Sequence, residues 1–338
     1  MNRRTGFGTF KMEKRGSGVM CMRKTAYGEP GQSSAVKLAG TGERLRYWAK
    51  EIYKNRVNYF FIAPMYLFLI AFLIIPTIQG LYLSFYQFTA DSAKRFVGLQ
   101  NFIALFRDPV FWIALKNTAV LVIGVVPSSL LVSLIISVII HRRSQILKSF
   151  VRGAFYLPLV VSSVALSISW KYIYDPAIGL GNYVLGLFGL DPVVWLGDAR
   201  YVLPALMFII FTFSLGKPIM LYLASLGAIP DTYYEAARID GAGSISQFVH
   251  ITLPMLKPTT LYLVVTGTIG AFQVFVFVKL LTSGGPNNSS QTLAYMLYEK
   301  AFIFGQFGIG CVIGTILCLI CMGIAIVEYK FLSSDIEY

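Results

Sequence analysis

Lys217 is the first residue whose type and position suggest chemistry, because it lies inside an apolar stretch long enough to cross a lipid bilayer. An ionisable side chain in such a stretch is by default a candidate for function. Two interpretations remain open. In the first, the ammonium lines a translocation path and helps to hold an anionic or hydroxyl-rich solute. In the second, its long stem lets the charge reach a cytoplasmic opening or a backbone carbonyl.

A second candidate group lies in a later apolar stretch and consists of Phe272, Gln273, Phe275 and Phe277. Aromatic faces beside an amide suit a sugar, which offers apolar C–H faces and many hydroxyls. The alternative is that these phenylalanines face lipid or pack in a core, as aromatic residues of membrane spans commonly do. The sequence leaves both interpretations open.

Signatures of an enzyme are missing from the sequence. Gly216-Lys217-Pro218 is not part of a G-x-x-x-x-G-K-[ST] phosphate loop, because the preceding glycine spacing is absent. The two histidines are too far apart for an H-E-x-x-H metal site. Cys318 and Cys321 form a C-x-x-C inside an apolar run, where we expect them to pack as small apolar side chains. We therefore expect no ATP hydrolysis by this chain alone, no bound cofactor and no metal.

The composition places these candidates in a bilayer. Hydrophobic residues make up 56% of the 338 residues and charged residues 13%, whereas soluble domains carry about a quarter charged residues. The net charge of +13 is unevenly distributed, because residues 1–57 hold thirteen Lys or Arg against four Glu. A basic arm before a first membrane span is better explained by contact with anionic lipid than by binding to nucleic acid.

Six segments are apolar enough to cross the membrane, which takes about 20 residues in a helix. They lie at roughly 59–85, 115–140, 153–173, 202–226, 259–281 and 307–329. Several prolines interrupt or flank these segments, and within a bundle we expect them to bend the helices rather than break them. The predicted fold class is an all-α integral membrane bundle of six transmembrane helices.

The orientation of the bundle follows from the distribution of Lys and Arg, which accumulate on the cytoplasmic side. The N-terminal arm and the connections after the second and fourth spans are basic, whereas segment 174–200 carries three Asp against Arg200 alone. We therefore expect both termini to be cytoplasmic, in agreement with an even number of spans.

The connection between the fourth and fifth spans, residues 228–258, is the most informative segment of the chain. Pro230 followed by Asp231 predicts the start of a helix, because proline suits the first turn and an acid suits the positive end of the helix dipole. Gly241 and Gly243 predict a turn after that helix.

A second short helix is predicted to follow the glycines. Ser244 or Ser246 can cap its start, and it is expected to end before Pro254. Two short helices joined by glycine form a compact projection toward the cytosol. On physical grounds alone, an ordinary solvated loop explains the segment equally well.

The residues of this connection resemble the coupling-loop signature of binding-protein-dependent ABC importer permeases. The signature runs Glu235-Ala236-Ala237-x-x-Asp240-Gly241-Ala242, followed by Phe248 and Ile251-Thr252-Leu253-Pro254. Similar motifs elsewhere are Phe96–Phe102, Asp108-Pro109, Asn117-Thr118, Leu157-Pro158, Trp170-Lys171, Trp195-Leu196 and Leu281–Pro286. The resemblance covers roughly residues 58–331 and is close to the maltose and glycerol-phosphate permease family, in its F-type half. The long outer insertion of the maltose F subunit is absent.

The resemblance implies a set of partners. The loop would dock on a separate ABC ATPase dimer, with Glu235, Ala236, Ala237, Asp240 and Gly241 at the contact. A second homologous permease would complete the pore, an extracytoplasmic solute-binding protein would deliver a carbohydrate, and the assembly would lie in the bacterial plasma membrane.

The resemblance also divides the chain into parts. A basic arm (1–57) precedes a permease domain (58–331), and a short tail (332–338) follows it. Solute contacts are implied near Gln273, whereas Lys217 has no counterpart in the family pattern.

Asn287 and Asn288 follow the fifth span. They either lie at the outer mouth of the pore, where a binding protein docks, or form a plain turn.

Two other classes of membrane protein, ion-coupled transporters and scaffolds or receptors, fit the sequence less well than an importer permease. An ion-coupled secondary transporter predicts inverted repeats, broken helices and membrane-embedded acids, and the predicted spans contain almost no Asp or Glu. A membrane scaffold or receptor built on the basic arm would have no need of a coupling loop.

Overall fold

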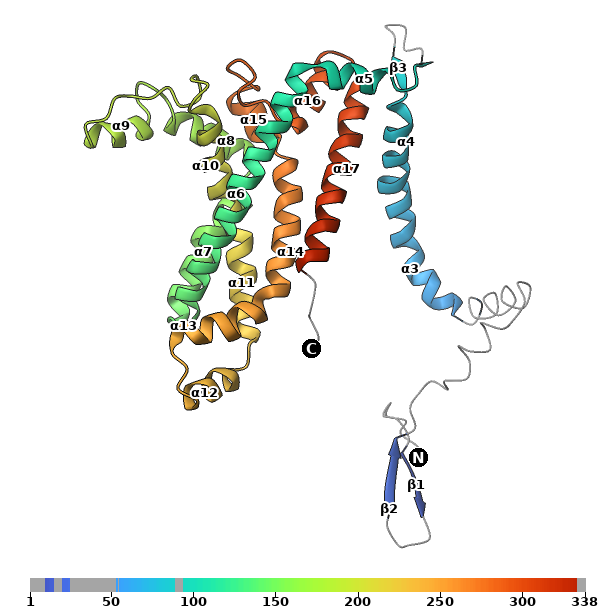
Figure 1. The fold of residues 1–338 in the computed structure, drawn as a ribbon, viewed down its shortest axis with the longest axis vertical. Helices are drawn as coiled ribbons and strands as arrows, with labels where there is room; N and C mark the ends of the chain where they lie inside the picture. The colour runs from blue at the N-terminus through green and yellow to red at the C-terminus, as the bar shows by residue number, and fades with distance from the viewer. Residues whose placement is uncertain (1–9, 15–19, 25–52, 54, 89–93, 333–338) are drawn as a thin grey trace. The chain divides into compact units, whose positions relative to one another are not determined.

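The computed structural model describes residues 10–14, 20–24, 53, 55–88 and 94–332, in two compact units, Met1–Pro76 and Thr77–Tyr338 (Figure 1). In the first unit, strands β1 (Phe10–Lys14) and β2 (Met20–Lys24) pair in an antiparallel hairpin. Most of the arm 1–57 and of the tail 332–338 lies outside the described residues, so the expectations for these two segments stay predictions.

The first predicted span is a helix from Arg56 to Leu83. It consists of α3 (Arg56–Leu69), a wider π-helical turn η1 (Ile70–Ile74) and α4 (Ile75–Leu83). The π turn immediately precedes Pro76, and in it the N–H of Ile75 bonds to the carbonyl of Ile70. Because proline lacks an N–H and its ring crowds the preceding turn, this widening lets the helix continue through it.

Long apolar helices in the second unit confirm the predicted second, fourth, fifth and sixth spans. They are α6 (Pro109–His141), α10 (Val202–Ser214) with α11 (Gly216–Ala228), α14 (Leu253–Phe272) with α15 (Val276–Leu281), and α17 (Phe307–Leu332). Helix α6 contacts α10, α11 and α14, and α14 contacts α17 (Figure 1).

The third predicted span, residues 153–173, is not one gently bent helix. It consists of α7 (Gln145–Val160) and α8 (Ser163–Ile173), whose axes differ by 99°. The residues between them are extended, and the hydroxyl of Ser162 accepts a hydrogen bond from the Val164 N–H at 3.3 Å, which starts α8 afresh. The expectation that prolines only bend these helices is therefore wrong for this segment.

Small and hydroxyl-bearing residues bring the helices of the second unit close together. Ser133 and Ser137 of α6 each donate a hydrogen bond at 3.3 Å, to the carbonyls of Leu215 and Ile219. A Cβ at Gly216 would lie 2.3 Å from the carbonyl oxygen of Phe155, so α7 and α11 approach backbone to backbone there. Such contacts are the usual means of helix association in a membrane, where lipid offers no hydrophobic gain.

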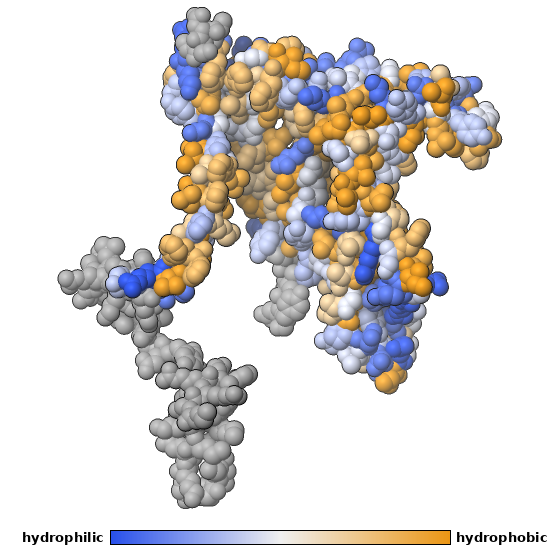
Figure 2. Space-filling model, turned by 180° about the vertical axis from the view of Figure 1, so that it is seen from behind, coloured by the Kyte–Doolittle hydropathy of each residue, from blue (hydrophilic) through white to orange (hydrophobic). Residues whose placement is uncertain are grey.

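Short elements occupy both ends of the bundle (Figure 1). One end carries α12 (Asp231–Ile239), α13 (Ser244–Gln247) and the π turn η2 (Phe248–Thr252). The other carries β3 (Tyr86–Phe88), β4 (Lys94–Phe96), α5 (Gln100–Arg107), α9 (Leu180–Leu187), α16 (Leu293–Tyr298) and η3 (Glu299–Ile303). Figure 2 shows hydrophilic side chains gathered at the α12 end, with apolar side chains over the middle of the unit.

Candidate functional site

Helix α12 begins after Pro230, as predicted, and ends at a glycine that its geometry requires. Gly241 has φ +79°, and its N–H bonds to the carbonyl three residues earlier at 3.1 Å, while the N–H of Ala242 bonds to the carbonyl five residues earlier at 2.8 Å. This pair of bonds is a Schellman motif, which needs a left-handed residue. A Cβ at Gly241 would meet no atom within 4 Å. Backbone conformation, and not lack of space within this chain, therefore requires the glycine.

The second helix of the loop starts at Ser244, but neither serine caps it. Its N-cap is Gly243, which has no side chain, and the Ser246 hydroxyl lies 3.4 Å from Nδ1 of His250. The predicted serine cap is therefore wrong. The chain can omit it because exposed N–H groups at a helix start can bond to water.

The prediction that this helix ends before Pro254 is also wrong. Helix α13 continues through η2 into α14, and in the π turn the N–H of Leu253 bonds to the carbonyl of Phe248. The widened turn accommodates Pro254 as η1 accommodates Pro76. A single helical rod therefore runs from the α12 end of the molecule to Phe272.

One side of α12 packs on this rod through Tyr234. Its hydroxyl lies 2.9 Å from Oγ1 of Thr252, in a buried contact, and its ring packs with Leu226, Ile229 and Leu256. The guanidinium of Arg142, at the end of α6, lies 5.4 Å from the centre of the Tyr234 ring, a favourable cation–π distance. Helix α12 is therefore attached to two of the long helices of the bundle.

Away from Tyr234 the surface of α12 is largely exposed, and it bears most of the residues that the sequence singled out. Glu235, Ala236, Asp240 and Gly241 are exposed, whereas Ala237 is half-buried. We call these five residues the docking face. Neither Glu235 nor Asp240 forms a side-chain hydrogen bond or ion pair with another residue that the structure describes.

Two aliphatic residues near the docking face were missed by the sequence analysis. Ile239 is 86% exposed and Ile245 is 82% exposed. Their position beside unpaired carboxylates gives this end of the molecule both apolar and charged surface, a mixture typical of protein interfaces. An aliphatic residue where a helical loop should be polar was the signal that could have identified them.

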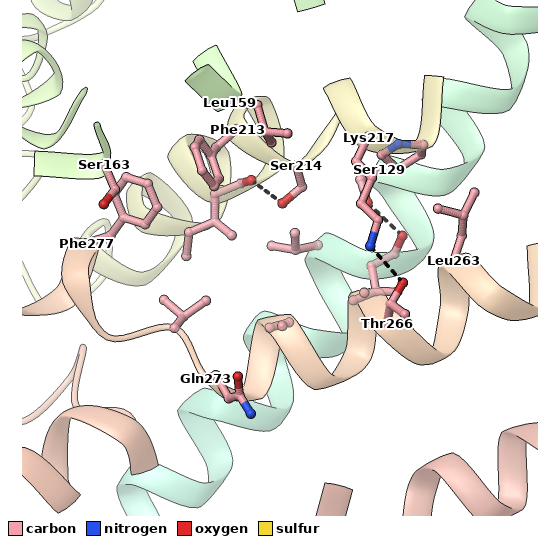
Figure 3. A pocket seen from close by; sticks show the side chains of 18 of the residues that line it. Ser129, Leu159, Ser163, Phe213, Ser214, Lys217, Leu263, Thr266, Gln273 and Phe277 are labelled. Atoms are coloured by element: carbon pink, nitrogen blue, oxygen red, sulfur yellow. Dashed lines mark hydrogen bonds between the residues drawn. The ribbon is translucent and has the colours of Figure 1, made fainter. Parts of the chain in front are cut away.

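A cavity of about 370 Å³ lies among α6, α7, α8, α10, α11, α14 and α15 (Figure 3). Apolar side chains, Phe213 and Phe277 among them, form much of its wall. Its polar side chains are Ser129, Ser163, Ser214, Lys217, Thr266 and Gln273. The cavity therefore combines aromatic faces with hydroxyl, amide and ammonium groups.

The structure brings Lys217 and the fifth span together at this cavity. Nζ of Lys217 lies 3.4 Å from Oγ1 of Thr266 (Figure 3). It also lies 5.1 Å from the centre of the Tyr262 ring. Lys217 is the second residue of α11, next to the close backbone contact between Gly216 and Phe155.

The aromatic and amide residues of the fifth span are divided by a break in the helix. Gln273 and Phe275 lie in the break between α14 and α15 and line the cavity. The Gln273 amide bonds to none of the residues that the structure describes. Phe272 does not join them: its side chain is 4% exposed and packs in the core with Val122 and Val126. One residue of shift along a helix turns a side chain by about 100°.

Glu328 lies inside the last predicted span and is an exception to the near absence of acids from the spans. Its Oε1 accepts a hydrogen bond from the Thr268 hydroxyl at 2.9 Å, whereas its Oε2 is buried with no partner among the residues described. A second cavity, of about 430 Å³ and largely apolar, borders this pair. An acid in a membrane span is a candidate for function by default.

The loop after α15 is held by the Asn117-Thr118 pair of α6. The Asn117 amide donates to the carbonyls of Asn288, Ser289 and Gln291 at 3.2, 3.1 and 3.0 Å. The Thr118 hydroxyl accepts from the N–H of the residue that starts α16, at 3.0 Å. Asn287 and Asn288 both have positive φ, of 49° and 59°. The Asn117-Thr118 motif therefore has a structural role, and the two asparagines form a turn.

We expect Asn117→Ala to destabilise this end of the molecule. The variant removes the two N–H donors that these three carbonyls share, and at about 1 kcal/mol for each donor the loss is about 2 kcal/mol. Thermal unfolding of the detergent-solubilised protein should show a lower Tm than wild type, with Ser128→Ala as the control, since that hydroxyl bonds only within its own helix. Equal Tm values for Asn117→Ala and wild type would contradict this role.

Comparison with protein families identifies the chain. Residues 129–327 match the family model described as the binding-protein-dependent transport system inner membrane component. The chain belongs to this family. A probable ABC transporter permease protein of Bacillus subtilis, YurN, is 35% identical over 83% of this chain and 97% of its own length. The lactose transport system permease protein LacF of Rhizobium radiobacter is 34% identical over 73% of this chain and 84% of its own length.

Solved structures show the same fold. The crystal structure of a bacterial ABC transporter involved in the import of the acidic polysaccharide alginate contains a chain that is 24% identical. The two superpose with a TM-score of 0.73, over 86% of this chain and all of that one.

Family membership settles the class of the protein. It is a multi-pass permease subunit of a binding-protein-dependent ABC importer in the bacterial inner membrane. The broken helices and Glu328 are features that an ion-coupled transporter would also show. Family membership nevertheless assigns the chain to the ABC importers, in place of an ion-coupled transporter or a membrane scaffold.

Proposed function

We propose that this permease forms half of a translocation pathway for a carbohydrate, together with a second homologous permease. The α12 end faces the cytoplasm and docks on a separate ABC ATPase dimer, and the opposite end receives solute from a binding protein. Both chain termini are then cytoplasmic. The chain itself binds no nucleotide, cofactor or metal, and ATP hydrolysis belongs to the partner.

The observation that carries this proposal is the two-sided character of α12. Tyr234 holds one side against the bundle, while Glu235 and Asp240 on the other side have no partner within the described chain. Carboxylates left without a local partner are suited to charge-assisted bonds with a second protein. The exposed Ile239 adds apolar area that such a partner would bury.

The continuous rod from α13 to α14 gives the docking face a mechanical connection to the cavity. Near the α12 end of the rod, Thr252 contacts Tyr234. The other end of the rod stops at Gln273, in the cavity wall. When ATP binding closes the ATPases, movement of α12 is transmitted along this rod to the break in the fifth span. The cavity then opens outward to accept solute, and hydrolysis resets it.

The carbohydrate assignment rests on the relatives and on the cavity. Relatives include the permease proteins named for lactose transport, diacetylchitobiose uptake and arabinooligosaccharide transport, each at least 28% identical over at least 73% of this chain. Phe275 and Phe277 offer faces to sugar C–H groups, and Gln273 offers an amide to hydroxyls.

Reconstitution tests the proposal. The permease is co-purified with its partners, placed in proteoliposomes with the binding protein outside, and supplied with radiolabelled oligosaccharides. We expect uptake that requires ATP inside the vesicles. Uptake without ATP, or uptake abolished by collapsing an ion gradient, would contradict the proposal.

Glu328 supplies a further test of the energy source. We expect Glu328→Gln to retain uptake within about twofold of wild type, because the amide oxygen still accepts from Thr268. Glu328→Leu, which cannot accept, should lower stability by about 1–3 kcal/mol. Uptake rates across a pH series provide the measurement. If Glu328→Gln abolished uptake while keeping its stability, Glu328 would carry protons and the ATP-driven account would be wrong.

A further inference from the structure

Lys217 is the only charged residue among those that line the 370 Å³ cavity. No Asp or Glu shares the cavity wall, so within the part of the chain that is described the ammonium has no counter-ion there. Its hydrogen bond to Thr266 is 3.4 Å long, which is beyond the usual range for N–H···O bonds. The cavity therefore carries a net positive charge that this chain does not neutralise.

Three other cations of the second unit are better partnered. Lys300 lies 2.9 Å from a carboxylate oxygen of Asp108, and Arg200 lies 3.0 Å from Asp198. Lys279 donates to the Tyr298 hydroxyl at 2.8 Å and lies 4.1 Å from the centre of that ring. Lys217 differs from these in having only a long contact with a hydroxyl and a more distant ring.

Three of the four hydroxyls that line the cavity already donate within their own helices, so Lys217 is its one cationic donor, beside the neutral donors of Ser163 and Gln273. Thr266 donates to the carbonyl of Tyr262 at 2.8 Å, and Ser214 donates to the carbonyl of Ile210 at 2.7 Å. Ser129 likewise donates within its own helix, at 3.0 Å. Because a hydroxyl has a single proton, these groups face the cavity as acceptors. They suit the O–H donors of a sugar but repel an anion, which leaves the ammonium as the natural partner of a negative group.

We propose that Lys217 is a specificity-determining residue and that the transported carbohydrate carries a negative charge, as a carboxylate, phosphate or sulfonate. The proposal rests on the proposed function, since it assumes that the cavity is part of the carbohydrate path. A charge on the solute supplies the partner that Lys217 lacks, through a charge-assisted hydrogen bond. Neutral hydroxyls of the same solute contact the serines, Thr266 and Gln273.

The test uses the complete transporter in proteoliposomes, with ATP inside and the binding protein outside. A mixture of neutral and acidic mono- and oligosaccharides is added, and the species that accumulate are identified by mass spectrometry. Lys217→Met is compared with wild type and with Lys217→Arg, which keeps the charge. Lys171→Met is the matched control, because Lys171 of α8 is exposed and does not line the cavity.

We expect acidic species to accumulate in wild type and to fall about tenfold in Lys217→Met, which corresponds to about 1.4 kcal/mol. Lys217→Arg and Lys171→Met should retain most of the uptake. Accumulation of neutral species alone, or of acidic species to the same level in Lys217→Met, overturns the proposal and leaves carbohydrate import intact. Loss of the second permease from the purified Lys217→Met complex also overturns it, because Lys217 would then pair with a carboxylate of that subunit. No ATP-dependent accumulation of any carbohydrate counts against the proposed function as well.

Discussion

Gly241→Asp should reduce ATP-dependent uptake at least a hundredfold while the protein still reaches the membrane. The substitution changes two things at once. It forces a side chain into a residue with φ +79°, at the Schellman closure of α12. It also adds a third carboxylate to the docking face beside Glu235 and Asp240, and a charge that loses water on docking without gaining a partner lowers affinity. Uptake into membrane vesicles and immunoblotting of the membranes measure the two outcomes.

Gly243→Asp is the matched control for this variant. Gly243 lies two residues further along the same loop, with φ −71°, and a Cβ there meets no atom within 4 Å. Asp is moreover favourable at the N-cap that Gly243 occupies. We expect uptake within a fewfold of wild type. Equal loss in both variants would show that any added acid in the loop is harmful, and normal uptake in Gly241→Asp would contradict the role given to the docking face.

Tyr234→Ala should separate ATP hydrolysis from transport. It removes the aromatic ring that packs α12 against the bundle, together with the hydroxyl contact to Thr252. Truncation of a buried aromatic side chain costs about 3–5 kcal/mol, enough to release α12 locally. The docking face itself is unchanged, so the ATPase should still bind and hydrolyse ATP. We expect ATP hydrolysis at more than half of the wild-type rate with uptake below a tenth.

Tyr234→Phe distinguishes the ring from the hydroxyl. It keeps the packing and the cation–π contact with Arg142 and loses only one hydrogen bond, worth about 1 kcal/mol. Uptake should fall no more than about threefold. If Tyr234→Ala lowered hydrolysis and uptake together, α12 would serve only for binding to the ATPase, and the transmission of movement through Thr252 would be wrong.

The membrane spans were predictable because their signal is local. A run of about 20 apolar residues specifies a spanning helix whatever its neighbours are. The break between Val160 and Ser163 was not predictable in this way, since the two helices together are still apolar enough for a span. The same proline chemistry gave two outcomes, with π turns before Pro76 and Pro254 and a 99° bend after Pro158. Local sequence does not decide among these, because neighbouring helices supply the partners of the freed carbonyls.

The candidate site was predictable to the extent that it rests on local rules. Pro230 and Gly241 were assigned correctly because a helix start and a left-handed helix end depend on the residues themselves. The position of Phe272 in a core, next to Gln273 in the cavity wall, depends on where α14 ends. Tertiary contacts hold the chain just beyond that end, such as the hydrogen bond from the Thr292 hydroxyl to the Val274 carbonyl at 3.2 Å.

The central claim is that the exposed side of α12 couples this permease to a separate ATPase. It is tested most directly by purifying the tagged protein from its native membrane in mild detergent and identifying the associated chains by mass spectrometry. We predict recovery of a second permease and an ABC ATPase with wild type, and loss of the ATPase alone with Gly241→Asp. Recovery of the wild-type protein by itself would contradict the claim. Equal recovery of the ATPase with wild type and with Gly241→Asp would also contradict it.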